Sequence, residues 1–126
     1  MEAAVGFRRF KSKSFARFAR REGIPDSELV EAIERLQKGL VDADLGGGLY
    51  KQRLARPGGG RSGGYRTILC FRREERVFFV HGFSKSSQCN ITKVQEHDLK
   101  VLASVLLQLS PETLRAMLDD GSLIEF

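Results

Sequence analysis

Two strand-like runs joined by a glycine-rich segment dominate the middle of this chain, in residues 49–73, LYKQRLARPGGGRSGGYRTILCFRR. Side chains alternate along residues 49–55, which predicts that Lys51 and Arg53 share one face of a strand, about 7 Å apart. The whole segment holds seven Lys or Arg residues and no Asp or Glu. A hairpin of this kind concentrates positive charge on one small sheet surface. That favours a polyanionic partner, with RNA or DNA as the first candidate.

The net charge of +5 is unevenly distributed along the 126 residues. Residues 1–50 hold 9 Lys/Arg against 8 Asp/Glu, residues 51–85 hold 9 against 2, and residues 86–126 hold 3 against 6. The positive charge is therefore local to the middle of the chain, whereas a merely soluble protein would have its charges interspersed. The acidic last third and its apolar tail, residues 123–126, suggest a protein partner more than an RNA surface.

Length and composition indicate a single domain over residues 1–126, cytoplasmic and reduced. No apolar run approaches the roughly 20 residues of a membrane span, and MEAAVGFRRFKSK has no apolar core for secretion, so no membrane association is expected. Cys70 and Cys89 are too few for a disulfide framework or a zinc site; Cys70 is expected in the core and Cys89 in a loop. No group of His, Cys, Asp and Glu has metal-ligand spacing, and neither a metal nor another cofactor is expected.

The hydrophobic periodicity changes from helical to strand-like and back along the chain. It predicts a strand (5–10), two helices (11–21, and from Asp26 or Ser27 to Gly39), three strands (49–55, 65–72, 77–83), an apolar helix (94–109) and a short helix with tail (111–126), the last signalled by Ser110-Pro111-Glu112. The fold class is therefore α+β: a small antiparallel sheet with an N-terminal helical hairpin and C-terminal helices, expected on one face of the sheet.

The glycine loop and the cations can each be explained without a functional site. Residues 58–64 do not match a phosphate-binding loop, because Ala55 stands at its first Gly position, Arg61 replaces its Lys, and a strand follows. A hairpin loop is favoured, and its mobility would still let Arg61 reach a phosphate. Lys51, Arg53 and Arg66 taken singly are typical of the wet face of a sheet. With Arg56, Arg61 and Lys85 nearby, a working surface becomes equally well supported.

Other chemical groups give weaker indications. His81 shares the strand parity of Phe79 and Phe83, so it faces either the core or the basic surface, and a structural role is favoured. His97 is expected on the surface. Ser84 and Ser86 lack evident His–Asp partners, which speaks against a serine hydrolase. Among the aromatic residues, Tyr65 is the one available to stack on a base.

The run LYKQRLARPGGGRSGGYRTI, followed by VFFVHGFSKSSQCNI, resembles the RelE/ParE superfamily of bacterial toxins, most closely its RelE/HigB-type branch. The resemblance covers roughly residues 5–110 and is anchored on a K-x-R strand, a G-Y-R strand start and an F-x-K strand end. It implies the compact fold of that family. It also implies an endoribonuclease that cuts mRNA, typically in the ribosomal decoding (A) site, and is silenced by a cognate antitoxin, often of helix-turn-helix type.

The resemblance also implies a set of site residues. The positions matching the catalytic ones are Lys51, Arg53, Arg66 and Lys85, and the RNA-binding positions are Arg56, Arg61, Tyr65 and Arg72. Two departures leave the acid and base open: the lysine pair is Lys/Arg here, an arginine being a poor proton acceptor, and the tyrosine that some members carry near the last helix has no match.

The chemistry of RNA cleavage fits these cations independently of the family. The 2′-hydroxyl is the nucleophile, and the phosphorane-like transition state gains negative charge that Arg53 and Arg66 would stabilise. Lys51, crowded by cations, is the candidate base, and Lys85 or water the candidate acid. Three alternatives remain: a non-catalytic nucleic-acid-binding module, a gyrase-targeting toxin of the ParE branch, and a degenerate toxin kept as a binding protein.

Overall fold

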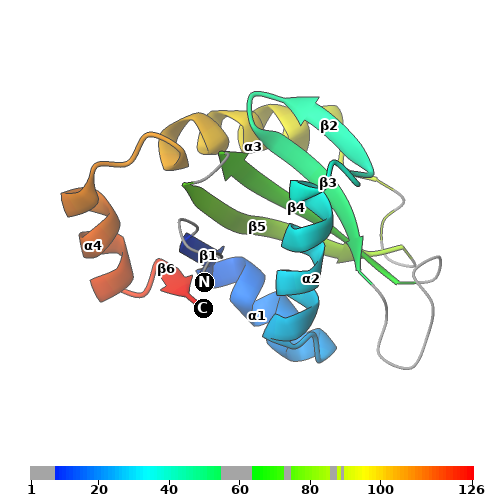
Figure 1. Cartoon of the computed structure of the whole chain (residues 1–126), viewed down its shortest axis with the longest axis horizontal. Coiled ribbons are helices and arrows are strands. Elements are labelled where there is room, and N and C mark those ends of the chain that lie inside the picture. The colour runs from blue at the N-terminus through cyan, green and yellow to red at the C-terminus, as the bar shows by residue number, and fades with distance from the viewer. Residues whose placement is uncertain (1–7, 55–63, 73–74, 86–87, 89) are drawn as a thin grey trace.

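The computed structural model describes residues 8–54, 64–72, 75–85, 88 and 90–126. These residues form an α+β fold with one sheet and helices on both of its faces (Figure 1). The elements are β1 (Arg8–Ser12), α1 (Lys13–Glu22), α2 (Asp26–Gln37), β2 (Ala43–Gly46), β3 (Leu49–Leu54), β4 (Tyr65–Arg72), β5 (Arg76–Ser84), α3 (Lys93–Leu106), α4 (Pro111–Asp119) and β6 (Leu123–Glu125). The predicted fold class is confirmed.

The sheet has the strand order β2-β3-β4-β5-β1-β6 in the described part of the chain. Its pairs are antiparallel except that of β1 with β5, which is parallel. The sequence predicted an antiparallel sheet throughout and treated residues 123–126 as a tail. Instead β6 pairs with β1 at the sheet edge, so the beginning and the end of the described chain lie side by side (Figure 1).

Helices cover both faces of the sheet, so the prediction that they pack on one face is wrong. The helices α1 and α2 pack over Leu69 and Phe79, while α3 and α4 pack over Ile68 and Phe78. The reason lies in β4 and β5, whose central side chains are apolar and buried on both parities. Such strands need cover on each side. The two faces are called here the α1/α2 face and the α3 face.

The caps explain where several helices begin. Ser12 Oγ accepts a hydrogen bond from the Phe15 N–H at the start of α1, and Ser110 caps α4 in the same way, with Pro111 in its first turn as predicted. Thr92 and Gln95 form a reciprocal capping box at the start of α3. The capping box fixes the start of α3 at the end of the connection that follows β5.

The cover that α3 gives is partial. It buries Ala103 and Leu106, whereas Val94, Val101 and Val105 remain more than half exposed. The connection that follows α3 is held to the sheet by Arg76, whose Nη1 donates to the carbonyl of Leu109 at 2.7 Å. The expectation of a strongly apolar helix that covers one side of the sheet is therefore only partly met. No helix in the described ranges is both long and apolar enough to cross a membrane.

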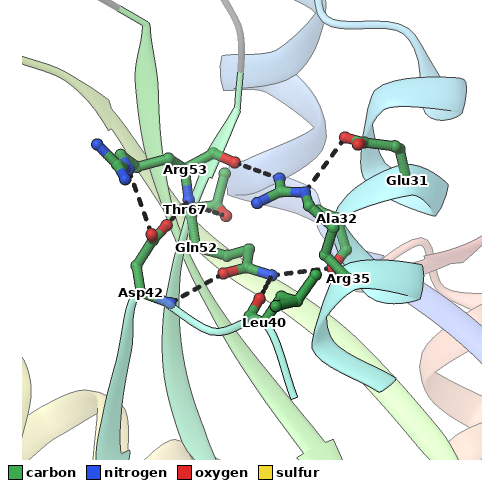
Figure 2. A network of polar contacts seen from close by, with 8 residues as sticks. All are labelled: Glu31, Ala32, Arg35, Leu40, Asp42, Gln52, Arg53 and Thr67. Carbon is green, nitrogen blue, oxygen red and sulfur yellow. Dashed lines mark hydrogen bonds and ion pairs between the residues drawn. The ribbon is translucent and has the colours of Figure 1, made fainter. Parts of the chain in front are cut away.

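A buried polar side chain joins β3 to the α1/α2 face. Gln52 is fully buried; its Nε2 donates to the carbonyls of Ala32 and Leu40, each at 3.0 Å, and its Oε1 accepts from the Asp42 N–H at 3.1 Å (Figure 2). Thr67 on β4, also fully buried, donates to the Gln52 carbonyl at 2.9 Å. Because every hydrogen bond here is to backbone, the position of β3 against α2 is fixed closely.

Candidate functional site

The pairing of β3 with β4 brings three of the predicted cations onto one face. Lys51 lies opposite Ile68, and Arg53 lies directly opposite Arg66. Ile68 belongs to the core under α3, so by strand alternation Lys51, Arg53 and Arg66 share the α3 face. The prediction that Lys51 and Arg53 lie on the same face is confirmed. We call these three residues the basic cluster.

Two arginines directly opposite each other repel, and the structure offsets this with a carboxylate from outside the basic segment. Asp42, in the connection after α2, lies 3.2 Å from Arg53 Nε through its Oδ1, and its other oxygen accepts from the Arg53 N–H (Figure 2). Gln52 holds the Asp42 backbone in turn. The side chain of Arg53 is still 44% exposed, so Asp42 orients it without burying it.

Lys51 has a partner in the connection between β5 and α3. Its Nζ donates to Asn90 Oδ1 at 3.3 Å. Asn90 is held in place because its carbonyl accepts from Gln88 Nε2 at 2.7 Å, and that nitrogen also donates to Gln95 Oε1 of the α3 capping box. The start of α3 is thus tied to Lys51, which brings a polar loop to the border of the basic cluster.

Arg66 differs from its two neighbours because part of its guanidinium group lacks a partner. Its Nη1 is shielded from solvent and makes no hydrogen bond in the part of the chain that the structure describes. Leaving such a donor buried and unpaired costs about 1–3 kcal/mol. A phosphate oxygen is the natural acceptor for a guanidinium nitrogen, so an anionic ligand would remove this cost.

His81 lies on the same face of the sheet as the basic cluster. The sequence alone had left open which face it occupies. A β-bulge shifts the register between β4 and β5, so that Leu69 pairs with Phe79 but Ile68 pairs with His81. His81 therefore lies on the α3 face with Arg66, and its ring is 5.8 Å from that of Phe83. Its Nε2 is shielded from solvent and unpaired among the described residues, and burial lowers the pKa of His81 below the ordinary 6.5.

Lys85 follows β5 directly and is exposed. Because Tyr65 pairs with Ser84 at the end of β5, Lys85 emerges at the same end of the sheet as Arg66. Arg56 and Arg61 lie outside the described residues, and so does Cys89. Their predicted positions therefore stay predictions.

Two predicted RNA-binding residues lie away from the basic cluster. Tyr65 is buried on the α1/α2 face, where its hydroxyl donates to Glu22 Oε1 at 3.1 Å and its ring meets Phe18 edge-on. Arg72 is at the far end of β4, about 20 Å along the strand from Arg66, and its Nη1 donates to the Leu107 carbonyl at 2.9 Å. Tyr65 is thus a core residue in this structure and Arg72 holds the end of α3, while their predicted roles in RNA binding stay predictions.

Cys70 is buried in the core, as expected for a small strand residue, and burial raises the pKa of its thiol to about 12. No group of three or more His, Cys, Asp and Glu side chains suited to a metal ion occurs among the residues described.

Residues 7–126 match the family model for the RelE toxin of the RelE/RelB toxin–antitoxin system. The chain belongs to this family. No curated protein and no solved structure gives a significant match. Membership makes the chain a toxin of a toxin–antitoxin system, which implies an antitoxin partner and an RNA target. The resemblance seen on the K-x-R, G-Y-R and F-x-K positions is thereby confirmed at the level of the family.

Proposed function

We propose that this RelE-family toxin is a metal-independent endoribonuclease that cleaves mRNA in the ribosomal A site, with the basic cluster as its active surface. The observation that carries the proposal concerns Arg66. Its buried Nη1 lacks a hydrogen-bond partner among the described residues, and it shares one face of the sheet with the cations Lys51 and Arg53. A guanidinium group kept in this condition is prepared to bind an anion, and the RNA backbone supplies one at every nucleotide.

The reaction proposed is attack of the 2′-hydroxyl on the adjacent phosphate. The substrate supplies its own nucleophile, so the protein's task is to place the phosphate and to stabilise the charge that grows on it. Arg66 does this with preorganised donors. Arg53, half-exposed and oriented by Asp42, lies opposite it and is positioned to contact the same or the next phosphate.

The proton transfers need further groups, for which the sequence nominates Lys51 as base and Lys85 or water as acid. Lys85 supports this scheme by its place at the Arg66 end of the sheet and by its exposure. Lys51 supports phosphate binding more readily than proton removal, because an ammonium group has three donors and no acceptor. Its hydrogen bond to Asn90 keeps it beside the cluster.

The partner proposed is a cognate antitoxin of the helix-turn-helix type that silences the toxin in the cytoplasm. Residues 86–126 carry 3 Lys/Arg against 6 Asp/Glu, and α3 exposes Val94, Val101 and Val105. An acidic, partly apolar surface is better suited to a protein than to RNA.

The test is controlled expression in bacteria with mapping of mRNA 5′ ends by primer extension. Wild-type protein is expected to produce new cuts within translated codons, and Arg66→Ala is expected to abolish them. Arg72→Ala is the matched control, because it removes the same side chain from the same strand at the far end and should cut normally.

Other results would point elsewhere. Growth arrest without cuts would move the target to gyrase, as in the ParE branch. A folded protein that binds RNA but neither cuts nor arrests growth would be a binding module or a degenerate toxin. Either result would overturn the proposal.

A further inference from the structure

Two unpaired nitrogens of opposite polarity lie on the same face of neighbouring strands. Arg66 Nη1 is a hydrogen-bond donor, and an imidazole nitrogen without a proton is an acceptor. Arg66 and His81 are diagonal neighbours, since Arg66 pairs with Phe83 and Ile68 pairs with His81, which separates them by about 7–8 Å. In the described part of the chain neither Arg66 Nη1 nor His81 Nε2 has a partner. Buried groups of this kind need an explanation, and a bound substrate that supplies the partners is one.

We infer that His81 is the group that removes the 2′-hydroxyl proton, beside Arg66 as the ligand of the scissile phosphate. This inference rests on the proposed function. A ribose next to its 3′-phosphate offers an acidic hydroxyl and an anionic oxygen within one nucleotide. That is the pair of groups complementary to one acceptor and one donor placed side by side.

The imidazole of His81 is suited to accept a proton at neutral pH. Burial disfavours its charged form and so lowers the pKa of His81. The charged groups described on the neighbouring elements include Lys51, Arg53 and Arg66 on the sheet and Lys93, Glu96, Asp98 and Lys100 on α3. Arg53 is paired with Asp42, and Glu96 with Lys100 at 3.2 Å. Neutral imidazole is therefore the resting form, whereas Lys51 offers donors alone.

The step balances without a further reactant. His81 Nε2 takes the 2′-hydroxyl proton as the O2′–P bond forms; the P–O5′ bond breaks, and the leaving 5′-oxygen takes a proton from Lys85 or water. The products are a 2′,3′-cyclic phosphate and a 5′-hydroxyl, and His81 returns its proton to solvent.

Access to His81 Nε2 requires a rearrangement of side chains. The nitrogen is shielded in the free protein, although the residue as a whole is only half-buried. Lys51 and Arg66 are long, partly exposed side chains on the same face, and their rotation toward a bound phosphate would open the imidazole. Catalytic hydrogen bonds commonly form only in the complex with substrate.

The experiment is single-turnover cleavage of mRNA on programmed ribosomes between pH 5.5 and 8.5, with wild-type protein, His81→Gln and His97→Gln. Loss of a general base is expected to lower the rate about 10²–10⁴-fold in His81→Gln. His97, the other histidine, is exposed on α3, and its variant should match wild type. Thermal unfolding of each variant checks that it is folded.

The pH profile of the wild type gives a second test that needs no substitution. If the base is His81, with its pKa lowered below 6.5, the cleavage rate should stay constant from neutral to alkaline pH and fall at acidic pH. This fall in the rate should be absent in His81→Gln. A rate that keeps rising into alkaline pH would indicate an amine base and contradict the inference, as would full activity of folded His81→Gln. An inactive wild type would instead overturn the proposed function, and the inference with it.

Discussion

Gln52 on the α1/α2 face differs from Arg66 and His81 on the α3 face in how its buried polar atoms are hydrogen-bonded. On the α1/α2 face, the side chain of Gln52 makes three hydrogen bonds to backbone groups although it is fully buried. On the α3 face, Arg66 Nη1 and His81 Nε2 are shielded from water and have no partner among the described residues. On α2, Arg35 Nε is also shielded and makes no hydrogen bond within the described part of the chain, but the Glu31 carboxylate lies 3.4 Å from it. Gln52 on β3 and Arg66 on β4 belong to neighbouring strands, since Arg53 pairs directly with Arg66.

This difference between paired and unpaired buried polar groups indicates which residues stabilise the fold and which are candidates for function. A polar group that is fully paired holds elements in one relative position, as Gln52 holds β3 against α2. A polar group that is buried and unpaired lowers stability, and it persists where a ligand supplies the partner. The α1/α2 face therefore fixes the strand, and under the proposed function the α3 face presents donors and an acceptor to RNA.

The largest effect is expected from Arg66→Met on the α3 face. Removal of a donor that stabilises the transition state should lower single-turnover cleavage about 10²–10³-fold. The free energy of unfolding should stay the same or rise, because the variant removes an unpaired buried donor and the repulsion with Arg53. Denaturant titration and cleavage assays measure the two effects. Arg72→Met, at the far end of β4, should leave cleavage unchanged.

Gln52→Leu is the opposite case on the α1/α2 face. It should lower the free energy of unfolding by about 2–4 kcal/mol, because it removes three hydrogen bonds and leaves the Asp42 N–H without its acceptor. Urea unfolding gives the value. Gln37→Leu, on the exposed end of α2, should change it by less than about 0.5 kcal/mol. A loss in Gln52→Leu no larger than in this control would refute the role of the network.

Tyr65→Phe distinguishes a core residue from a stacking platform. Loss of the hydrogen bond to Glu22 should lower the free energy of unfolding by about 1 kcal/mol and leave cleavage unchanged. Thermal unfolding and the cleavage rate measure both. Weaker RNA binding in Tyr65→Ala at unchanged stability would restore the stacking role predicted from the sequence.

The smallest effect is expected from Asp42→Asn, which removes the charge that orients Arg53. Since the Arg53–Asp42 pair is partly exposed, stability should change little. Freed Arg53 should be less well placed, and cleavage should fall about two- to fivefold. Cleavage rates at several salt concentrations measure this. A rise in cleavage would show that Asp42 instead competes with the phosphate for Arg53.

Local patterns in the sequence predicted the strands of the candidate site and the three cations of the basic cluster. The bounds of β4 were predicted as observed, and alternation placed Lys51 and Arg53 correctly because β3 is regular. The face of His81 was not predicted, because the bulge in β5 puts His81 and Phe79 on opposite faces of the sheet. Alternation of side chains along the sequence does not reveal such a bulge.

Contacts between segments far apart in the sequence could not be predicted from local sequence patterns. Asp42 and Asn90 reach the basic cluster from connections outside residues 49–73, so the absence of acids in that segment overstated its free positive charge. The strand β6 is three residues long and is stabilised by pairing with β1, more than 100 positions away. Strand propensity in so short a segment is too weak to predict without its partner.

The most direct test of the account is to measure unfolding free energy and cleavage per folded molecule side by side in Arg66→Met and Gln52→Leu. The account predicts opposite outcomes: Arg66→Met keeps its stability and loses cleavage about 10²–10³-fold, while Gln52→Leu loses about 2–4 kcal/mol and keeps cleavage within a few-fold. If Arg66→Met were destabilised as much as Gln52→Leu, or still cleaved RNA normally, the unpaired guanidinium would be a structural group and the central claim would be wrong.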